Sequence, residues 1–369
     1  MEDYAVSFLA NLLKIYSPSG KEGEIRSFLA DEMKKLGFKV RVDEIGNLIG
    51  EVGEGTPKIL LCGHMDTVPG YIPVRIIDGK LYGRGAVDAK SPLASMILAA
   101  SSVTEKVSSG KIVVVGTIEE EKSGRGVKHL IEKGLSADYA VFGEPSGIEN
   151  IVIGYKGNLK LKITCKTQTG HSASPWLFEN SIEKAFEICN MIKGIHFPNE
   201  DLNSRFYSLT SCILRLKGGE SAANNVPWRC EAIVDIRVPP QLTCLEVLEE
   251  INDRLTQYKN ANQKVTVKIQ VIDSTEAFEL SKNNRLVHVL SSTIREIRGK
   301  IPVLVRKTGT SDMNILGRIL KIPIVAYGPG NSSLDHTPNE HIEIKDYMDC
   351  IKIFQKFLAK MFSYNSNSE

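Results

Sequence analysis

Two residues that could hold a metal ion close a short apolar run at residues 60–69. His64 and Asp66 are two positions apart, and residues at this spacing point to the same side of a strand. If extended backbone continues past His64, its imidazole and the Asp66 carboxylate project together, which suits a metal-bound histidine with a carboxylate beside it. A strand-end histidine bonded to a turn aspartate has the same pattern, so the pair needs support from elsewhere in the chain.

A third candidate, Asp88, lies in the glycine-rich stretch 82–90. A helix is expected to follow at 91–100, with Ser91 as N-cap and Pro92 at the first helical position. Asp88 would therefore lie in a tight loop at a helix entrance.

Acidic and histidine side chains also follow three further apolar runs, which are expected to be buried strands at 111–117, 139–142 and 322–327. Apolar runs with helices between them predict an α/β fold with a mostly parallel, mixed sheet covered by helices on both faces. Sites in such sheets lie beyond the carboxyl ends of the strands. The residues collected at these ends are His64, Asp66, Asp88, Glu120, Glu121, Glu144 and His336.

Each candidate also has a purely structural interpretation. Asp88 suits a helix cap or an ordinary loop. The acidic run 119–121 suits a solvated turn, although its place directly after an apolar strand argues against this. His336 suits a plain loop, and His341 is a competing late histidine.

Two histidines and several carboxylates around one point would repel one another unless cations neutralised them. Two divalent ions could each take one histidine, one glutamate and a shared aspartate. Oxygen and imidazole ligands favour zinc, with cobalt or manganese as alternatives, and exclude a thiolate site. The seven cysteines are scattered without a Cys-x-x-Cys motif, so we expect buried reduced thiols.

The composition, with 369 residues, 42% hydrophobic and 24% charged, predicts a globular protein of two or three domains. A net charge of +2 excludes a global field that would recruit nucleic acid or an anionic membrane. No apolar stretch approaches the ~20 residues that span a bilayer. Residues 6–16 read as an amphipathic helix rather than a signal peptide, so we expect a soluble, cytoplasmic protein.

The middle of the chain alternates apolar and polar residues, which predicts strands with one buried face. These strands, with two helical patterns, occur in the order β-α-β-β-α-β of ferredoxin-like domains. We therefore predict an inserted α+β domain at 157–272, and a metal-binding domain made of 1–156 and 273–369. The expected strands lie near 159–165, 208–216, 231–238 and 264–271, and the helices at 181–193 and 242–258.

Several motifs together are specific enough to suggest a family. They are His64-x-Asp66, Gly83-Arg84-Gly85-x-x-Asp88-x-Lys90, Glu119-Glu120-Glu121, Gly143-Glu144-Pro145, Gly170-His171-Ser172 and the late His336. Over essentially the whole chain, the sequence resembles the co-catalytic zinc amidohydrolases, which include carboxypeptidase G, aminoacylase, acetylornithine deacetylase and succinyl-diaminopimelate desuccinylase. The stretch 306–314 narrows the resemblance to hydrolases that release lysine or ornithine from an amino-group carrier protein.

The resemblance implies a phosphorylase/hydrolase-like zinc peptidase core that binds two divalent ions. One ion would be held by His64 and Glu144, the other by Glu121 and His336, with Asp88 bridging the two. Asp66 would hold the His64 ring. The resemblance also implies a cis peptide after Asp88, whereas Ser91 departs from the usual glycine at its position.

The family's Asp-Glu-Glu motif implies that Glu120 is the general base and Glu121 the ligand, because Glu119 takes the place of the aspartate. Neighbouring side chains on an extended segment point apart, which fits two different roles. A shift of one residue in the alignment of this run with the family motif remains an alternative, and it would change the assigned roles. His171, on the inserted domain, matches a lid histidine that helps to hold the developing oxyanion, often across a dimer interface.

Substrate contacts are also implied by the resemblance, with Arg306 as a bidentate partner for the free carboxylate of the bound amino acid. The positions expected to contact substrate are Asn225, Arg237, Arg306, Gly309 and Thr310. Lys160, Lys162 and Lys166 form either the solvated face of a strand or a landing surface for an acidic carrier protein.

The implied activity is hydrolysis of the amide between the terminal glutamate of an acidic amino-group carrier protein and the α-amino group of lysine or ornithine. The free amino acid would be the product, in lysine or arginine biosynthesis. The alternatives are an N-acyl amino acid deacylase, an aminopeptidase, or a non-enzymatic relative that binds peptides or amino acids. A homodimer or larger assembly through the inserted lid domain is expected by analogy.

Overall fold

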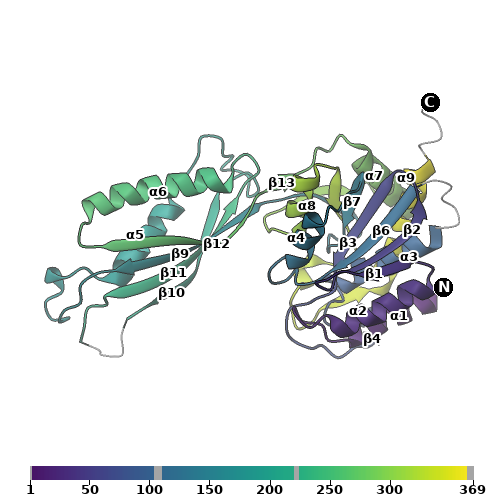
Figure 1. Cartoon of the computed structure of the whole chain (residues 1–369), viewed down its shortest axis with the longest axis horizontal. Coiled ribbons are helices and arrows are strands. Elements are labelled where there is room, and N and C mark those ends of the chain that lie inside the picture. The colour runs from purple at the N-terminus through teal and green to yellow at the C-terminus, as the bar shows by residue number, and fades with distance from the viewer. Residues whose placement is uncertain (1, 104–109, 220–223, 364–369) are drawn as a thin grey trace. The chain divides into compact units, whose positions relative to one another are not determined.

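A computed structural model describes residues 2–103, 110–219 and 224–363, which form two compact units (Figure 1). Unit 1 comprises Met1–Gly154, Leu280–Arg306 and Ser311–Glu369. Unit 2 comprises Tyr155–Glu279 and Lys307–Thr310. The chain therefore passes into unit 2 twice, first for residues 155–279, which build most of that unit, and again for the short segment 307–310.

Unit 1 contains a large mixed sheet with the strand order β1-β2-β6-β3-β7-β15-β8, and β14 also pairs with β8. The central strand β3 runs parallel to β6 and β7, and β7 runs parallel to β15. The strands are β1 (Lys39–Val42), β2 (Leu48–Glu54), β3 (Lys58–His64), β6 (Gly110–Thr117), β7 (Tyr139–Phe142), β8 (Asn150–Tyr155), β14 (Val303–Lys307) and β15 (Ile324–Ala326). The predicted α/β fold with a mainly parallel, mixed sheet is confirmed, and the antiparallel pairs lie at its margins.

Both faces of this sheet are covered. Leu60 and Leu61 point to opposite faces of β3, and each has no exposed surface. Burial of a leucine side chain is worth about 1.5–3 kcal/mol, so the apolar runs favour this central position. The helices of unit 1 are α1 (Glu2–Lys14), α2 (Gly23–Lys35), α3 (Lys90–Val103), α4 (Arg125–Glu132), α7 (Arg285–Arg298), α8 (Asp312–Leu320) and α9 (Ile344–Ser363).

Helix α3 begins at Lys90, so the prediction of Ser91 as its N-cap is wrong. The Ser91 hydroxyl lies inside the first turn and donates to the main-chain oxygen of Ala86, at 2.6 Å. The Lys90 ammonium donates to the main-chain oxygens of Leu12 and Ile15, at 3.2 and 2.6 Å. These bonds hold the helix entrance, and with it the Asp88 loop, against the end of α1.

A small three-stranded sheet in the order β16-β5-β4 completes unit 1. Its strands are β4 (Arg75–Ile77), β5 (Lys80–Tyr82) and β16 (His341–Glu343). The turn between β4 and β5 has positive φ at Asp78 and Gly79, of 49° and 75°, which is typical of an Asp-Gly hairpin turn. Since β16 pairs with β5, this sheet brings the segment after His336 beside the segment before Asp88.

Unit 2 is a four-stranded antiparallel sheet in the order β10-β11-β9-β12, whose buried residues pack with two helices. Its elements are β9 (Gly157–Lys166), η2 (Pro175–Leu177), α5 (Ser181–Lys193), β10 (Thr210–Gly218), β11 (Arg229–Val238), α6 (Cys244–Ala261) and β12 (Thr266–Thr275). Short strand β13 (Phe278–Glu279) follows, where the chain returns to unit 1. The β-α-β-β-α-β order and the sheet order are those of a ferredoxin-like arrangement.

Among the described residues, no helix is long and apolar enough to cross a membrane. All seven cysteines are free thiols, and all but Cys212 are buried, as the sequence predicts.

Candidate metal centre

His64 is the last residue of the central strand β3 and is fully buried. Its Nδ1 lies 2.9 Å from the main-chain oxygen of Asp66, and its Nε2 lies 3.3 Å from Oδ1 of Asp88. A main-chain oxygen only accepts, so Nδ1 carries a proton and donates it there. Nε2 is then the atom that faces the Asp88 carboxylate.

The Asp66 carboxylate lies beside the His64 ring and also contacts the acidic turn after β6. Its Oδ1 lies 3.6 Å from Nδ1 of His64, so the main-chain oxygen of Asp66 makes the closer contact to the ring. The carboxylate also accepts hydrogen bonds from the main-chain N–H groups of Glu120 and Glu121, both at 3.1 Å, and from the Ser19 hydroxyl at 2.6 Å. Asp66 therefore connects the end of β3 to the acidic turn after β6.

Asp88 lies between two histidines. Its Oδ1 faces Nε2 of His64, and its Oδ2 lies 3.0 Å from Nε2 of His336. Burial alone would raise the pKa of Asp88, but the bonds from His336 and His64 outweigh it and lower the pKa well below its usual value. The peptide between Asp88 and Ala89 is cis, as the resemblance implies.

His336, and not His341, lies beside these groups. The Nε2 of His336 is 3.0 Å from Oε1 of Glu121 as well as from Asp88. The bonds to Asp88 and then Glu121 raise the pKa of His336 to about 10. His341 lies in β16, where its ring packs 4.8 Å from that of Tyr82.

The three consecutive glutamates lie on a turn, so the expected extended backbone is wrong. Strand β6 ends at Thr117, and Glu119 has a positive φ of 53°. The turn directs Glu119 toward the hydroxyl of Ser123 and the guanidinium of Arg125. Glu121 is directed toward His336 instead.

Among the described residues of unit 1, two groups of side chains could each hold a metal ion. One comprises His64, Asp88 and Glu121, and the other comprises His64, Glu120 and Glu144. The potential ligand atoms within each group lie within 4.8 Å of one another. All are imidazole nitrogens or carboxylate oxygens, the donors that divalent zinc, cobalt and manganese accept.

The electrostatics of this cluster fit a bound cation. Burial, followed by the charge of Glu144, raises the pKa of Glu120 well above its usual value. The other groups that act on Glu120 are His64, Asp312 and Asp88. Burial also lowers the pKa of His64, but bonds to Asp66 and Asp88 outweigh it and raise the pKa. Protons on these groups balance the concentrated negative charge, which is the role that divalent ions would take.

The other predicted residues are divided between the units. Arg306 belongs to unit 1, on β14. In unit 2, His171 and Asn225 form an isolated antiparallel bridge, and the Arg237 guanidinium donates to the Thr310 hydroxyl at 3.0 Å. Gly309 is exposed in the segment that rejoins unit 2. Each unit thus assembles part of the predicted residue set.

Sequence reasoning did not assign functions to Ser19, Arg84, Asp312 or Glu340, although all four are part of this region. Ser19 contacts Asp66. Burial raises the pKa of Asp312, at the start of α8, to about 7. Arg84 and Glu340 form a buried ion pair of 2.7 Å. Arg84 lies in the glycine-rich motif, four positions before Asp88, and Glu340 lies four positions after His336; these places in the sequence are the signals that could have identified the two residues.

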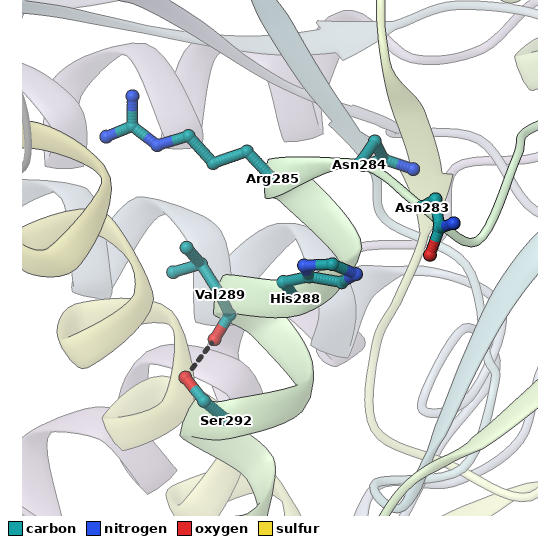
Figure 2. Close-up of a pocket in the computed structure, with 6 residues that line it drawn as sticks. All are labelled: Asn283, Asn284, Arg285, His288, Val289 and Ser292. Carbon is teal, nitrogen blue, oxygen red and sulfur yellow. Dashed lines mark hydrogen bonds between the residues drawn. The ribbon is translucent and has the colours of Figure 1, made fainter.

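A separate open cavity of about 550 Å³ lies at the start of α7 (Figure 2). Asn284 caps this helix by accepting from the N–H of Val287, and His288 and Ser292 follow along its surface. The lining residues are Asn283, Asn284, Arg285, His288, Val289 and Ser292. They include none of the predicted site residues.

Residues 60–360 match the model of the peptidase family M20/M25/M40. The chain belongs to this family. The match spans every predicted metal ligand and the inserted unit, which confirms the resemblance inferred from the motifs.

Individual proteins are similar to this one over nearly the whole chain. A [LysW]-lysine/[LysW]-ornithine hydrolase of Saccharolobus solfataricus is 34% identical over 97% of this chain and 96% of its own. A [LysW]-lysine hydrolase of Deinococcus radiodurans is 32% identical over 97% of both chains. Among solved structures, a Staphylococcus aureus tripeptidase shares the fold, with a TM-score of 0.84 at 22% identity over 98% of this chain and 99% of its own.

Proposed function

We propose that this M20/M25/M40 family member hydrolyses the amide between the terminal glutamate of an amino-group carrier protein and the α-amino group of lysine or ornithine. The observation that carries the proposal is full-length similarity to hydrolases named for [LysW]-lysine and [LysW]-ornithine, with LysW in the place of the carrier. The product would be the free amino acid, in lysine or arginine biosynthesis. The centre in unit 1 supports a hydrolytic role, because it has both potential ligands and a buried carboxyl that could transfer protons.

We propose that His64 and Glu144 hold one divalent ion, that Glu121 and His336 hold the other, and that Asp88 bridges them. The contacts of Asp88 with both histidines support the bridging role. The 3.0 Å contact between Glu121 and His336 supports Glu121, rather than Glu120, as the ligand of the second ion. When bound, zinc, or cobalt or manganese in its place, would polarise the amide carbonyl and lower the pKa of water.

Glu120 is the proposed general base. It takes a proton from the attacking water while the water oxygen bonds to the amide carbon, and it returns that proton to the nitrogen as the C–N bond breaks. The raised pKa of Glu120, caused by burial and Glu144, suits a group that must gain and lose a proton in one cycle. Asp66 holds the main-chain N–H groups of both Glu120 and Glu121, so it orients the base relative to the ligand.

We assign the remaining substrate contacts to the other predicted residues. His171 would donate to the oxygen that becomes negative, and Asn225, bridged to it, would support that position. Arg306 would bind the free carboxylate of the amino acid. Arg237, Gly309 and Thr310 would complete the substrate contacts, a role supported by the bond between Arg237 and Thr310.

The solvent face of the unit 2 sheet supports docking of an acidic carrier. The strand registers place eight basic side chains on this face against three acidic ones, Glu231, Asp235 and Asp273. The basic residues are Lys160, Lys162, Lys166, Arg215, Lys217, Arg229, Arg237 and Lys268. We name these eight residues the basic face. Excess positive charge of this kind steers an acidic protein toward its binding surface.

We also propose that two copies associate through unit 2. Strand β10 is at the edge of its sheet, with β11 as its partner among the described strands. Leu214 and Leu216 on this strand are 55% and 40% exposed. An exposed edge with apolar side chains favours pairing with another chain, which sedimentation velocity would detect as a dimer.

The test compares carrier–lysine and carrier–ornithine conjugates with acetyl-lysine, acetylornithine and a tripeptide, in the presence of zinc or cobalt. We expect kcat/KM for a carrier conjugate to exceed that for the acetylated amino acids by at least about 100-fold, because remote carrier contacts contribute binding energy in the transition state. Faster release from acetylated amino acids would assign a deacylase, and faster cleavage of the tripeptide an aminopeptidase. Binding without turnover of any substrate would assign a non-enzymatic relative.

A further inference from the structure

The buried ion pair between Arg84 and Glu340 is connected to both sides of the proposed metal centre. Glu340 has no exposed surface, and Arg84 is 7% exposed. The Arg84 Nη1 donates to Glu340 Oε2 at 2.7 Å, although the residues are 256 positions apart. A charge pair at this depth costs solvation free energy, so its position requires a further explanation.

The Glu340 carboxylate holds the main chain that carries the proposed bridging ligand. Its Oε1 accepts from the N–H groups of Val87 and Asp88, at 2.9 and 3.0 Å. Residues 84–89 form a turn, and the main-chain N–H of Gly83 before it donates to the main-chain oxygen of Glu340 at 3.3 Å. The Glu340 side chain therefore takes the part of a hydrogen-bonding partner for the backbone of Asp88.

The Arg84 guanidinium joins two other segments to the same point. Its Nε donates to the main-chain oxygen of Gly70 at 2.9 Å, in the segment that follows His64 and Asp66. Its Nη1 also donates to the main-chain oxygen of Thr337 at 3.3 Å, directly after His336. The guanidinium is planar and has several N–H donors, so it can bond the Glu340 carboxylate and the two main-chain oxygens in one fixed geometry. A lysine ammonium cannot reproduce this geometry.

His336 needs such support. Its φ of 62° lies in the left-handed region, which is unfavourable for a residue with a side chain, and 48% of the side chain is exposed. Glu340 follows His336 by four positions, and Arg84 precedes Asp88 by four. Two chain segments are thus joined twice, once between His336 and Asp88 and once between Glu340 and Arg84.

We propose that Arg84 and Glu340 are positioning residues that set the distance between the His336 segment and Asp88, and thereby keep the second metal position at binding geometry. This inference rests on the proposed two-metal centre. Neither residue is a proposed ligand or proton carrier, so both would act only through Asp88 and His336.

The experiment measures metal stoichiometry and affinity in wild type, Glu340→Gln and Arg84→Lys. The readouts are metal content at buffered free zinc and the visible spectrum of cobalt-loaded protein. We expect wild type to bind two ions. In each variant, the affinity for one ion should fall by about tenfold or more, and the affinity for the other should stay unchanged. Arg298→Lys is the matched control, because it alters an Arg cluster with Glu149 and Asp349 in the same unit.

Thermal unfolding of the metal-free proteins separates folding from positioning. Variants that fold and hold both ions with wild-type affinity would overturn the inference. If both variants fail to fold while Arg298→Lys folds, the pair determines the fold and the inference is equally overturned. If wild type itself holds fewer than two ions, the proposed two-metal function fails.

Discussion

The Nε2 atom of His336 lies 3.0 Å from Oδ2 of Asp88, although the two residues are 248 positions apart. Asp88 follows β5 and precedes α3, whereas His336 lies in the loop between β15 and β16. Pairing of β16 with β5 brings these segments together. The centre therefore depends on the fold of the whole of unit 1 rather than on a local motif.

Glu120→Ala should reduce kcat by about 10²- to 10⁴-fold while the protein still binds its metal ions, because the general base is lost and the proposed ligands remain. Metal content and turnover of the carrier conjugate are measured on the same sample. Glu119→Gln is the matched control, since this side chain contacts Ser123 and Arg125, and its kcat should stay near wild type. Retained activity in Glu120→Ala would move the base to another residue of the run.

His336→Ala and His341→Ala should differ in metal content. His336 contacts Asp88 and Glu121, so its loss should lower the affinity for one metal ion by about 100-fold. His341 packs on Tyr82, so its variant should keep both ions. Zinc titration with a competing chromophoric chelator provides the measurement. Equal affinities in the two variants would contradict the assignment of His336.

Metal loading should become tighter as the pH rises. In the metal-free protein, Asp88 and Glu121 raise the pKa of His336 to about 10, so its ring is protonated at pH 7. A metal needs the neutral ring and must displace this proton. Apparent affinity should therefore increase by up to about tenfold per pH unit for each proton displaced, until the pH exceeds the pKa.

Calorimetry in two buffers of different ionisation enthalpy measures the released protons directly. At pH 7, wild type should release more protons per bound ion than His336→Ala. Metal affinity that stays constant between pH 6 and pH 9 would contradict the proposed role of His336.

Charge reversal on the basic face should weaken recognition of the carrier. The variant Lys160→Glu/Lys166→Glu should raise KM for the carrier conjugate at low salt, and the effect should shrink at 0.15 M salt, where the screening length is about 8 Å. The matched control, Lys193→Glu/Lys259→Glu, changes the same net charge on helices α5 and α6. Equal KM values for the two variants would show that the lysines of β9 do not contribute to carrier recognition and only form the solvated face of the strand.

The sequence by itself determined the strand ends at which the site forms. Runs such as 58–62 and 139–142 are too apolar for exposed strands, and the carboxyl ends of neighbouring parallel strands meet at one edge of a sheet. His64 and Glu144, which follow these two runs, were therefore expected to lie together. The sequence also distinguished the antiparallel sheet of unit 2 from the mainly parallel sheet of unit 1. Residues 159–166 alternate between apolar and polar, whereas the buried strands of unit 1 are continuous apolar runs.

Only the tertiary structure decided where individual side chains point. A positive φ at Glu119 turns the acidic run and separates Glu119 from Glu121, and backbone of this kind does not follow from the residue types. The choice of His336 over His341 depends on a loop held by Arg84 and Glu340. Such contacts join segments far apart in the chain, so local spacing contains no information about their distance.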